Sequence, residues 1–173
     1  MYTGLSAALR KAVRLDMIAS SPMEKVEPPE HEKREIETLE PEEAAAYIQA
    51  AMEQPAGPLL ILMLCLGLRR NEARGIRNED LDPDGILHIR HQRTRAGLAK
   101  LKSKASRREI PVPVALRAFF EGTSGEFVVD VSEKSLRMQH LRVLSSIGVD
   151  RRVTLHGLRH PYVKKSQNFF SVI

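Results

Sequence analysis

The run LLILMLCLGL at residues 59–68 is apolar on every side of a helix, and this feature constrains the fold more than any other. A helix without a polar face must be surrounded by other elements, so the run predicts a buried central helix that Gly67 ends. The stretch 59–66 is far too short to cross a bilayer, and the amino terminus lacks the features of a signal peptide. We therefore expect a cytoplasmic protein with no membrane partner.

The single cysteine, Cys65, lies inside this run. One cysteine cannot form an internal disulfide, so a secreted disulfide scaffold is excluded. We expect a buried, inert thiol in a reducing compartment.

Apolar periodicity predicts most of the remaining elements, and a first-turn proline, acids and alanines predict the helix at 41–52. We expect helices over residues 4–18, 41–52, 114–120 and 134–147, and a last helix that opens near Leu155. Strands 86–93 and 108–113 are expected to pair across a basic hairpin connection, and a short strand is expected at 127–131. The predicted class is α+β, mainly α, with a small antiparallel β-sheet.

Residues 19–35 contain three prolines and no apolar periodicity, which predicts a linker. A single helix cannot bury its own apolar stripe. We therefore expect residues 1–18 to be the tail of a domain whose body lies upstream of Met1, and residues 36–173 to form a second domain.

The chain has 27 Lys and Arg residues against 22 Asp and Glu, and the excess is concentrated in residues 91–120 and 151–173. Two separated basic stretches are typical of surfaces that face a polyanion. They are equally compatible with two solvated basic faces.

Three blocks carry a resemblance to a known family: GLRRNE at 67–72, KSKASRREIPVP at 102–113 and TLHGLRH at 154–160. Their order and spacing resemble the catalytic domain of tyrosine recombinases, the phage integrase family, over residues 5–161. Residues 1–18 resemble the last helix of the family's core-binding domain. The resemblance implies DNA integration or recombination through a 3′-phosphotyrosine, often for a mobile element, with DNA and other recombinase protomers as partners.

The chemistry gives a reason for these residue types. Cleaving a phosphodiester without a metal needs fixed cations on the nonbridging oxygens, and arginine offers a permanently charged bidentate fork. The resemblance implies that Arg69 and Arg159 hold the scissile phosphate and that Lys102 protonates the departing 5′ oxygen. His156 would assist proton transfer or brace the phosphate, and Glu72 would orient the cluster. Further residues expected to contact DNA are Arg70, Arg93, Arg95, Lys100, Lys104, Arg107, Arg108, Arg151 and Arg152.

Each assignment has an alternative. Arg69 could be a solvated residue at a helix end, with Arg70 as the match after a slip of one residue. Lys100, Lys104, Arg107 and Arg108 compete with Lys102. Glu72 could be a surface partner of Arg69 or Arg77.

His156 and His160 have the spacing of a helical zinc pair. However, the glutamate of H-E-x-x-H is missing, no third ligand is apparent, and Arg159 would repel a dication. We expect His160 to be a core or supporting residue, and we expect neither a metal nor another cofactor.

The sequence departs from the family after His160. Pro161 stands where the family usually has threonine, and no Leu-Gly-His box or following tyrosine appears. Of the tyrosines, Tyr2, Tyr47 and Tyr162, none lies where the nucleophile belongs. We therefore expect a catalytic domain, incomplete at both ends and with an ending typical of a frameshift or premature stop, that binds DNA phosphate without cutting it alone. The alternative is a non-enzymatic DNA-binding remnant or modulator of a complete recombinase.

Overall fold

The computed structural model describes residues 2–28, 36–101, 107–121 and 125–159, which belong to two compact units, Met1–Glu35 and Ile36–Ile173. In the first unit, helix α1 (Tyr2–Arg14) precedes a 3-10 helix, η1 (Pro22–Lys25). The Tyr2 hydroxyl donates to the Val26 carbonyl oxygen at 3.0 Å. Helix α1 ends four residues before the predicted Ile18, and Asp16 takes a left-handed φ of 54°.

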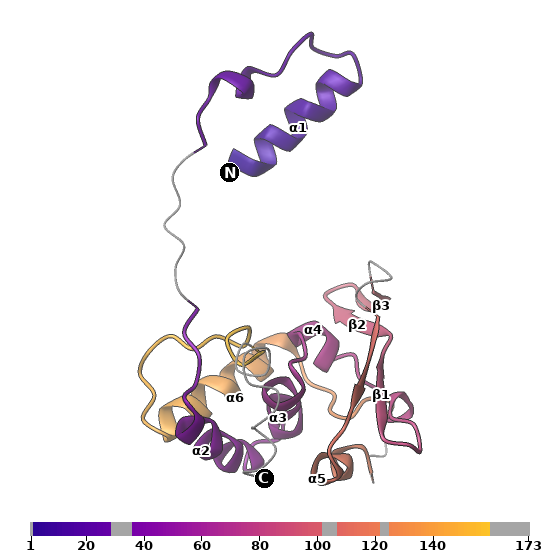
Figure 1. The fold of residues 1–173 in the computed structure, drawn as a ribbon, viewed down its shortest axis with the longest axis vertical. Helices are drawn as coiled ribbons and strands as arrows, with labels where there is room; N and C mark the ends of the chain where they lie inside the picture. Colours follow the sequence, from indigo (N-terminus) through magenta and orange to yellow (C-terminus); the bar gives the residue numbers. More distant parts are fainter. Residues whose placement is uncertain (1, 29–35, 102–106, 122–124, 160–173) are drawn as a thin grey trace. The chain divides into compact units, whose positions relative to one another are not determined.

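The second unit is built around helix α3 (Gly57–Leu66), which lies between helices α2 (Pro41–Met52) and α6 (Glu133–Ser146) and the strands (Figure 1). Every residue from Leu59 to Leu66 is buried, which confirms the predicted central helix. Cys65 is buried with them, and this burial raises the pKa of its thiol to about 12. None of the helices that the structure describes is long and apolar enough to cross a membrane.

Gly67 ends α3 in the left-handed conformation, with φ 62° and ψ 34°. A residue with a Cβ atom adopts this conformation only at a cost, so glycine suits the position. The turn buries Leu68 and leads into the short helix α4 (Arg70–Ala73). The end of the central helix thus delivers Arg69 to the surface.

The strands form two separate antiparallel pairs. Strand β1 (Ile86–Ile89) pairs with β4 (Arg108–Pro111), with Leu87 opposite Ile110, and β2 (His91–Thr94) pairs with β3 (Gly97–Lys100). The predicted single strand 86–93 is therefore two strands, β1 and β2, which are separated at Arg90. The hairpin of β2 and β3 lies between β1 and its partner β4 in the chain. The break coincides with a change in burial. Leu87 and Ile89 of β1 are buried in the core, whereas no residue of β2 or β3 is buried.

The segment before α6 corrects one expectation. The predicted strand 127–131 is wrong: Phe127 forms only an isolated bridge with Arg77, although Val128 and Val131 are buried. The predicted helix 114–120 is α5 (Val114–Arg117) followed by a 3-10 helix, η4 (Ala118–Phe120). Another 3-10 helix of this unit, η2 (Asn78–Asp80), precedes β1.

The chain after α6 begins a helical turn where the last helix was expected. The Leu158 amide donates to the Thr154 carbonyl oxygen at 3.2 Å, and the Arg159 amide donates to that of His156 at 3.2 Å. Residues from His160 onward lie outside the described part of the chain. His156 and Arg159 therefore sit at the two ends of one turn.

Candidate functional site

A buried carboxylate, that of Glu72, lies at the centre of the site. Its side chain is 1% exposed, although α4 lies at the surface. It accepts hydrogen bonds from the Arg69 backbone amide and guanidinium, both at 2.8 Å, and from the two terminal nitrogens of Arg108 at 3.1 and 2.9 Å. Burial acts to raise the pKa of Glu72, but these donors outweigh it and lower the pKa below the ordinary value. The alternative that Glu72 is a surface partner is thus wrong.

Arg159 joins this group from the far end of the chain. Burial, and then the positive charges of Arg69 and Arg108, lower the pKa of Arg159, whereas the charge of Glu72 raises it. Arg159 and Arg108 line one hollow together with Gly67. Arg69 and His156 line a second hollow with Leu68 and Leu155.

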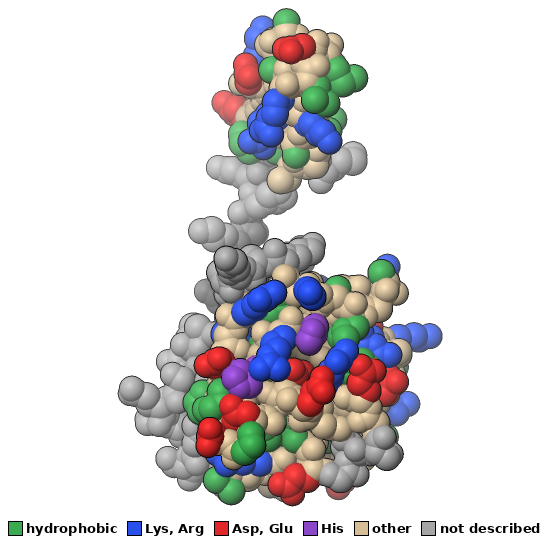
Figure 2. Space-filling view, turned by 90° about the vertical axis from the view of Figure 1, so that its right-hand side faces the viewer, with side chains coloured by type: hydrophobic (Ala, Val, Ile, Leu, Met, Phe, Trp, Pro, Cys, Tyr) green, Lys and Arg blue, Asp and Glu red, His purple; other side chains and the backbone are tan. Residues whose placement is uncertain are grey.

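We call Arg69, Glu72, Arg108, His156 and Arg159 the cation cluster. It sets three guanidinium groups against one carboxylate, so its net charge is positive without any contribution from His156. Basic and histidine side chains gather with acidic ones on one face of this unit (Figure 2). Because guanidinium ions match the oxygens of a phosphate, the cluster suits a phosphodiester.

The segment that carries His156 and Arg159 is held by a buried polar chain. The Tyr47 hydroxyl lies 2.7 Å from His140 Nδ1, and His140 Nε2 lies 3.0 Å from the Val153 carbonyl oxygen. A carbonyl oxygen only accepts, so Nε2 carries the proton and, in the neutral ring, Nδ1 accepts from Tyr47. Helices α2 and α6 are thereby tied to the backbone three residues before His156.

Two further contacts hold the same segment from residues 37–43. Arg151 forms ion pairs with Glu37 and Glu43 and donates to the Thr38 carbonyl oxygen at 2.8 Å. Gly157 packs so closely on this stretch that a Cβ atom there would lie 2.5 Å from the Glu37 carbonyl oxygen. Because Arg151 is occupied in this way, we leave it out of the proposed DNA surface.

The other predicted residues lie as follows. Arg70 turns away from Glu72 to pair with Glu133 at 2.8 Å, which favours Arg69 over Arg70 as the cluster residue. Arg93 pairs with Asp130 and lies over the Phe127 ring, 4.8 Å from its centroid. Four of the predicted DNA contacts are exposed, namely Arg95, Lys100, Arg107 and Arg152. Lys102, Lys104, His160 and Tyr162 lie outside the described residues.

Sequence reasoning missed the part that Arg108 takes in the cluster, since it treated this residue only as a DNA contact or as a competitor of Lys102. A buried carboxylate commonly needs more than one hydrogen-bond donor. This requirement was the one signal that Glu72 has a second basic partner besides Arg69. Within the described ranges, no three His, Cys, Asp or Glu side chains lie close enough together to hold a metal ion.

Solved structures supply the decisive comparison. The Tn1549 transposon integrase in complex with transposon right end DNA superposes with a TM-score of 0.73 at 16% identity, over 99% of this chain and 67% of that one. A lambda integrase dimer bound to a COC′ core site gives 0.68 at 17%, over 98% and 67%. This chain has the tyrosine recombinase fold.

XerA recombinase shares the tyrosine recombinase fold too, with a TM-score of 0.60 at 17% identity, over 99% of this chain and 65% of that one. This chain thus spans about two thirds of the length of these solved chains. No protein-family profile matches the chain, and no curated protein matches it either.

Replacing Glu72 tests the centre of the site. Glu72→Ala should lower the free energy of unfolding by about 3–5 kcal/mol, because it leaves Arg69 and Arg108 facing each other without their shared counter-charge. The measurement is equilibrium unfolding in urea. As a control, Glu79→Ala removes an exposed carboxylate that pairs with Arg77 and should cost less than about 1 kcal/mol. Equal effects of the two changes would contradict the central role of Glu72.

The buried His140 predicts a dependence of stability on pH. Burial lowers the pKa of His140 below its ordinary value of 6.5, despite the hydrogen bond to Val153. As the pH falls below about 6.5, His140 becomes protonated in the unfolded chain but stays neutral in the folded chain. The contribution of His140 to the free energy of unfolding is therefore fully present above this pH and decreases below it. His140→Gln should reduce the loss of unfolding free energy between pH 7 and 5.5, measured in urea. An unchanged slope would exclude this histidine as the cause.

Proposed function

We propose that the chain binds the backbone of duplex DNA and holds one phosphodiester in the cation cluster, in the manner of a tyrosine recombinase acting in site-specific recombination or integration. The observation that carries the proposal is the gathering of three arginines around one carboxylate: Arg69 and Arg108 bind Glu72, and Arg159 lines a hollow with Arg108 and senses the charges of all three. The recombinase fold supports it, as do the DNA complexes of the Tn1549 and lambda integrases.

The cluster suits the transition state of phosphoryl transfer. Negative charge builds up on the nonbridging oxygens as the phosphorus is attacked, and preorganised cations stabilise that charge. In our proposal Arg69 and Arg159 contact these oxygens, and Glu72 keeps Arg69 and Arg108 in place. His156, which lines the hollow beside Arg69, braces the phosphate or moves a proton. Lys102 protonates the 5′ leaving oxygen.

We extend the proposal to the organisation of the chain. Residues 1–18 are the final helix of a core-binding domain, residues 19–35 a linker, and residues 36–173 an integrase catalytic domain that works in the cytoplasm with other recombinase protomers. The two compact units, whose boundary falls after Glu35, support this division. The phosphate chemistry needs no cofactor.

A second candidate, a DNA-binding module that does not itself cut DNA, is favoured by the tyrosines in the described ranges. The Tyr47 side chain is fully buried beside His140, and the Tyr2 hydroxyl donates to the Val26 carbonyl oxygen in the other unit. The Tyr47 hydroxyl is therefore not available to attack a phosphate in the cluster, and that of Tyr2 is engaged within its own unit.

DNA binding tests the proposed function. The chain should bind duplex DNA weakly, with little sequence preference and with affinity that falls steeply as salt rises from about 50 to 200 mM. Arg69→Ala and Arg159→Ala should each reduce the slope of log K against log salt concentration by about 0.9, since each removes a phosphate contact. Fluorescence anisotropy measures both quantities. Arg142→Ala, which removes an exposed charge on α6, is the matched control.

The covalent step separates the two candidate functions. With a labelled, nicked duplex that traps a phosphotyrosine product, the non-cutting module predicts no band of higher mass on a denaturing gel, because no attacking oxygen is at hand. A band that disappears in Tyr162→Phe would instead establish a cutting enzyme. Binding that is insensitive to salt and unchanged in Arg69→Ala would contradict both functions.

A further inference from the structure

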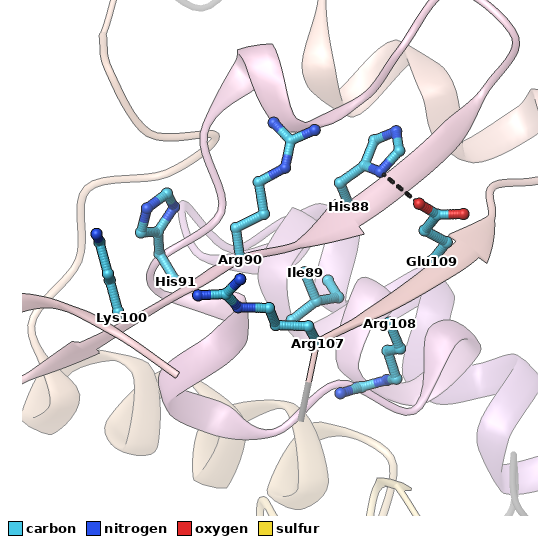
Figure 3. Close-up of a pocket in the computed structure, with 8 residues that line it drawn as sticks. All are labelled: His88, Ile89, Arg90, His91, Lys100, Arg107, Arg108 and Glu109. Atoms are coloured by element: carbon cyan, nitrogen blue, oxygen red, sulfur yellow. Dashed lines mark ion pairs between the residues drawn. The ribbon is translucent and has the colours of Figure 1, made fainter. Parts of the chain in front are cut away.

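A third hollow, lined by several basic side chains, lies beside the cation cluster. His88, Arg90, His91, Lys100, Arg107 and Arg108 line it, together with Ile89 and Glu109. The side chains come from β1, the break before β2, the end of β3 and the start of β4. Arg90, His91, Lys100 and Arg107 surround one space, whereas His88 is turned toward Glu109 (Figure 3).

The acid in this hollow, Glu109, lies at its edge beside His88. Glu109 lies 3.3 Å from His88 Nδ1, and the other ring nitrogen of His88 lies 2.9 Å from Asp82. The three exposed cations, Arg90, Lys100 and Arg107, have no ion pair or hydrogen bond with any residue in the described part of the chain. With Glu109 the one acid among the described lining residues, the cations of the hollow outnumber its carboxylate and leave it with net positive charge.

An independent observation concerns His91. Its Nδ1 atom is buried and has no hydrogen-bond partner among the described residues. The His91 ring lines the hollow beside the three cations, and an imidazole N–H is a donor that suits a phosphate oxygen. A phosphate oxygen can accept a hydrogen bond from this ring as well as from the cations.

The hollow and the cluster share a wall. Arg108 lines this hollow and also lines the hollow of Arg159, while its guanidinium is held by Glu72. Successive phosphates of one DNA strand are about 3.4 Å apart along the helix axis. Because Arg108 lines both hollows, a strand with one phosphate in the cluster can place a neighbouring phosphate at this hollow.

We infer that this hollow is a second phosphate subsite, in which Arg90, His91 and Lys100 hold a backbone phosphate of the strand whose neighbouring phosphate occupies the cation cluster. The inference rests on the proposed function and deepens it, because it assigns a place to a phosphate that is not cleaved. The subsite fixes the position of the strand along the cluster. Phosphate contacts of this kind set the register of a protein on DNA without reading its sequence.

The test is a set of salt titrations of duplex binding, measured by fluorescence anisotropy. Arg90→Ala and Lys100→Ala should each reduce the slope of log K against log salt concentration by about 0.9, relative to Arg142→Ala. Both side chains are exposed, and thermal melting of each variant confirms that it folds as the parent does.

Double variants identify the phosphate. Arg90→Ala combined with Lys100→Ala should lose little more slope than either alone, because both act on one phosphate. Arg90→Ala combined with Arg69→Ala should lose about 1.8, because two phosphates are released. An Arg90→Ala slope equal to that of Arg142→Ala would overturn the subsite and leave the cluster standing if Arg69→Ala still weakens binding. Additive losses in Arg90→Ala with Lys100→Ala would refute a shared phosphate.

Discussion

The site depends on one charge, the buried carboxylate of Glu72. Guanidinium groups brought together repel one another, and Arg159 shows this repulsion in a pKa lowered by burial and by the charges of Arg69 and Arg108. Glu72 offsets part of it by pairing with an arginine from the end of the central helix and with one from β4. The arrangement keeps an excess of positive charge available for an anion while the protein alone stays folded.

The elements with strong local signals were predicted from the sequence. The apolar run at 59–68 predicts α3, and the proline and acids that open residues 41–52 predict α2. The apolar alternation at 86–93 predicts a strand paired with 108–113, of which residues 86–89 and 108–111 form the pair β1 and β4. The break at Arg90 was missed because the alternation of apolar and polar letters continues past the point where burial ends. The strand expected at 127–131 does not form, although Val128 and Val131 are buried. Here the apolar residues correctly indicate burial, but no partner strand among the described residues is present to pair with them.

For the site, the motif blocks were enough to select Arg69, Glu72, His156 and Arg159, but they could not show what holds these residues together. Arg108 joins Glu72 from a strand far along the chain, and Arg151 is engaged by Glu43 instead of facing a ligand. Such pairings depend on tertiary packing, which no local pattern reports. The buried pair of Tyr47 and His140 is a similar case, because polar residues on an apolar helix face find their partners only in the folded protein.

The contacts of residues 37–43 with the segment 151–157 have a consequence for where the second unit functionally begins. By secondary structure alone, it would start at Pro41, the first residue of α2. Yet Glu37 and Thr38, which belong to no helix or strand, contact Arg151, and the Glu37 carbonyl oxygen lies against Gly157. A protein trimmed to the start of α2 would keep its helices and lose the backing of the turn that carries His156 and Arg159. The working boundary of this unit is therefore set by an irregular stretch of backbone that supports the opposite end of the chain.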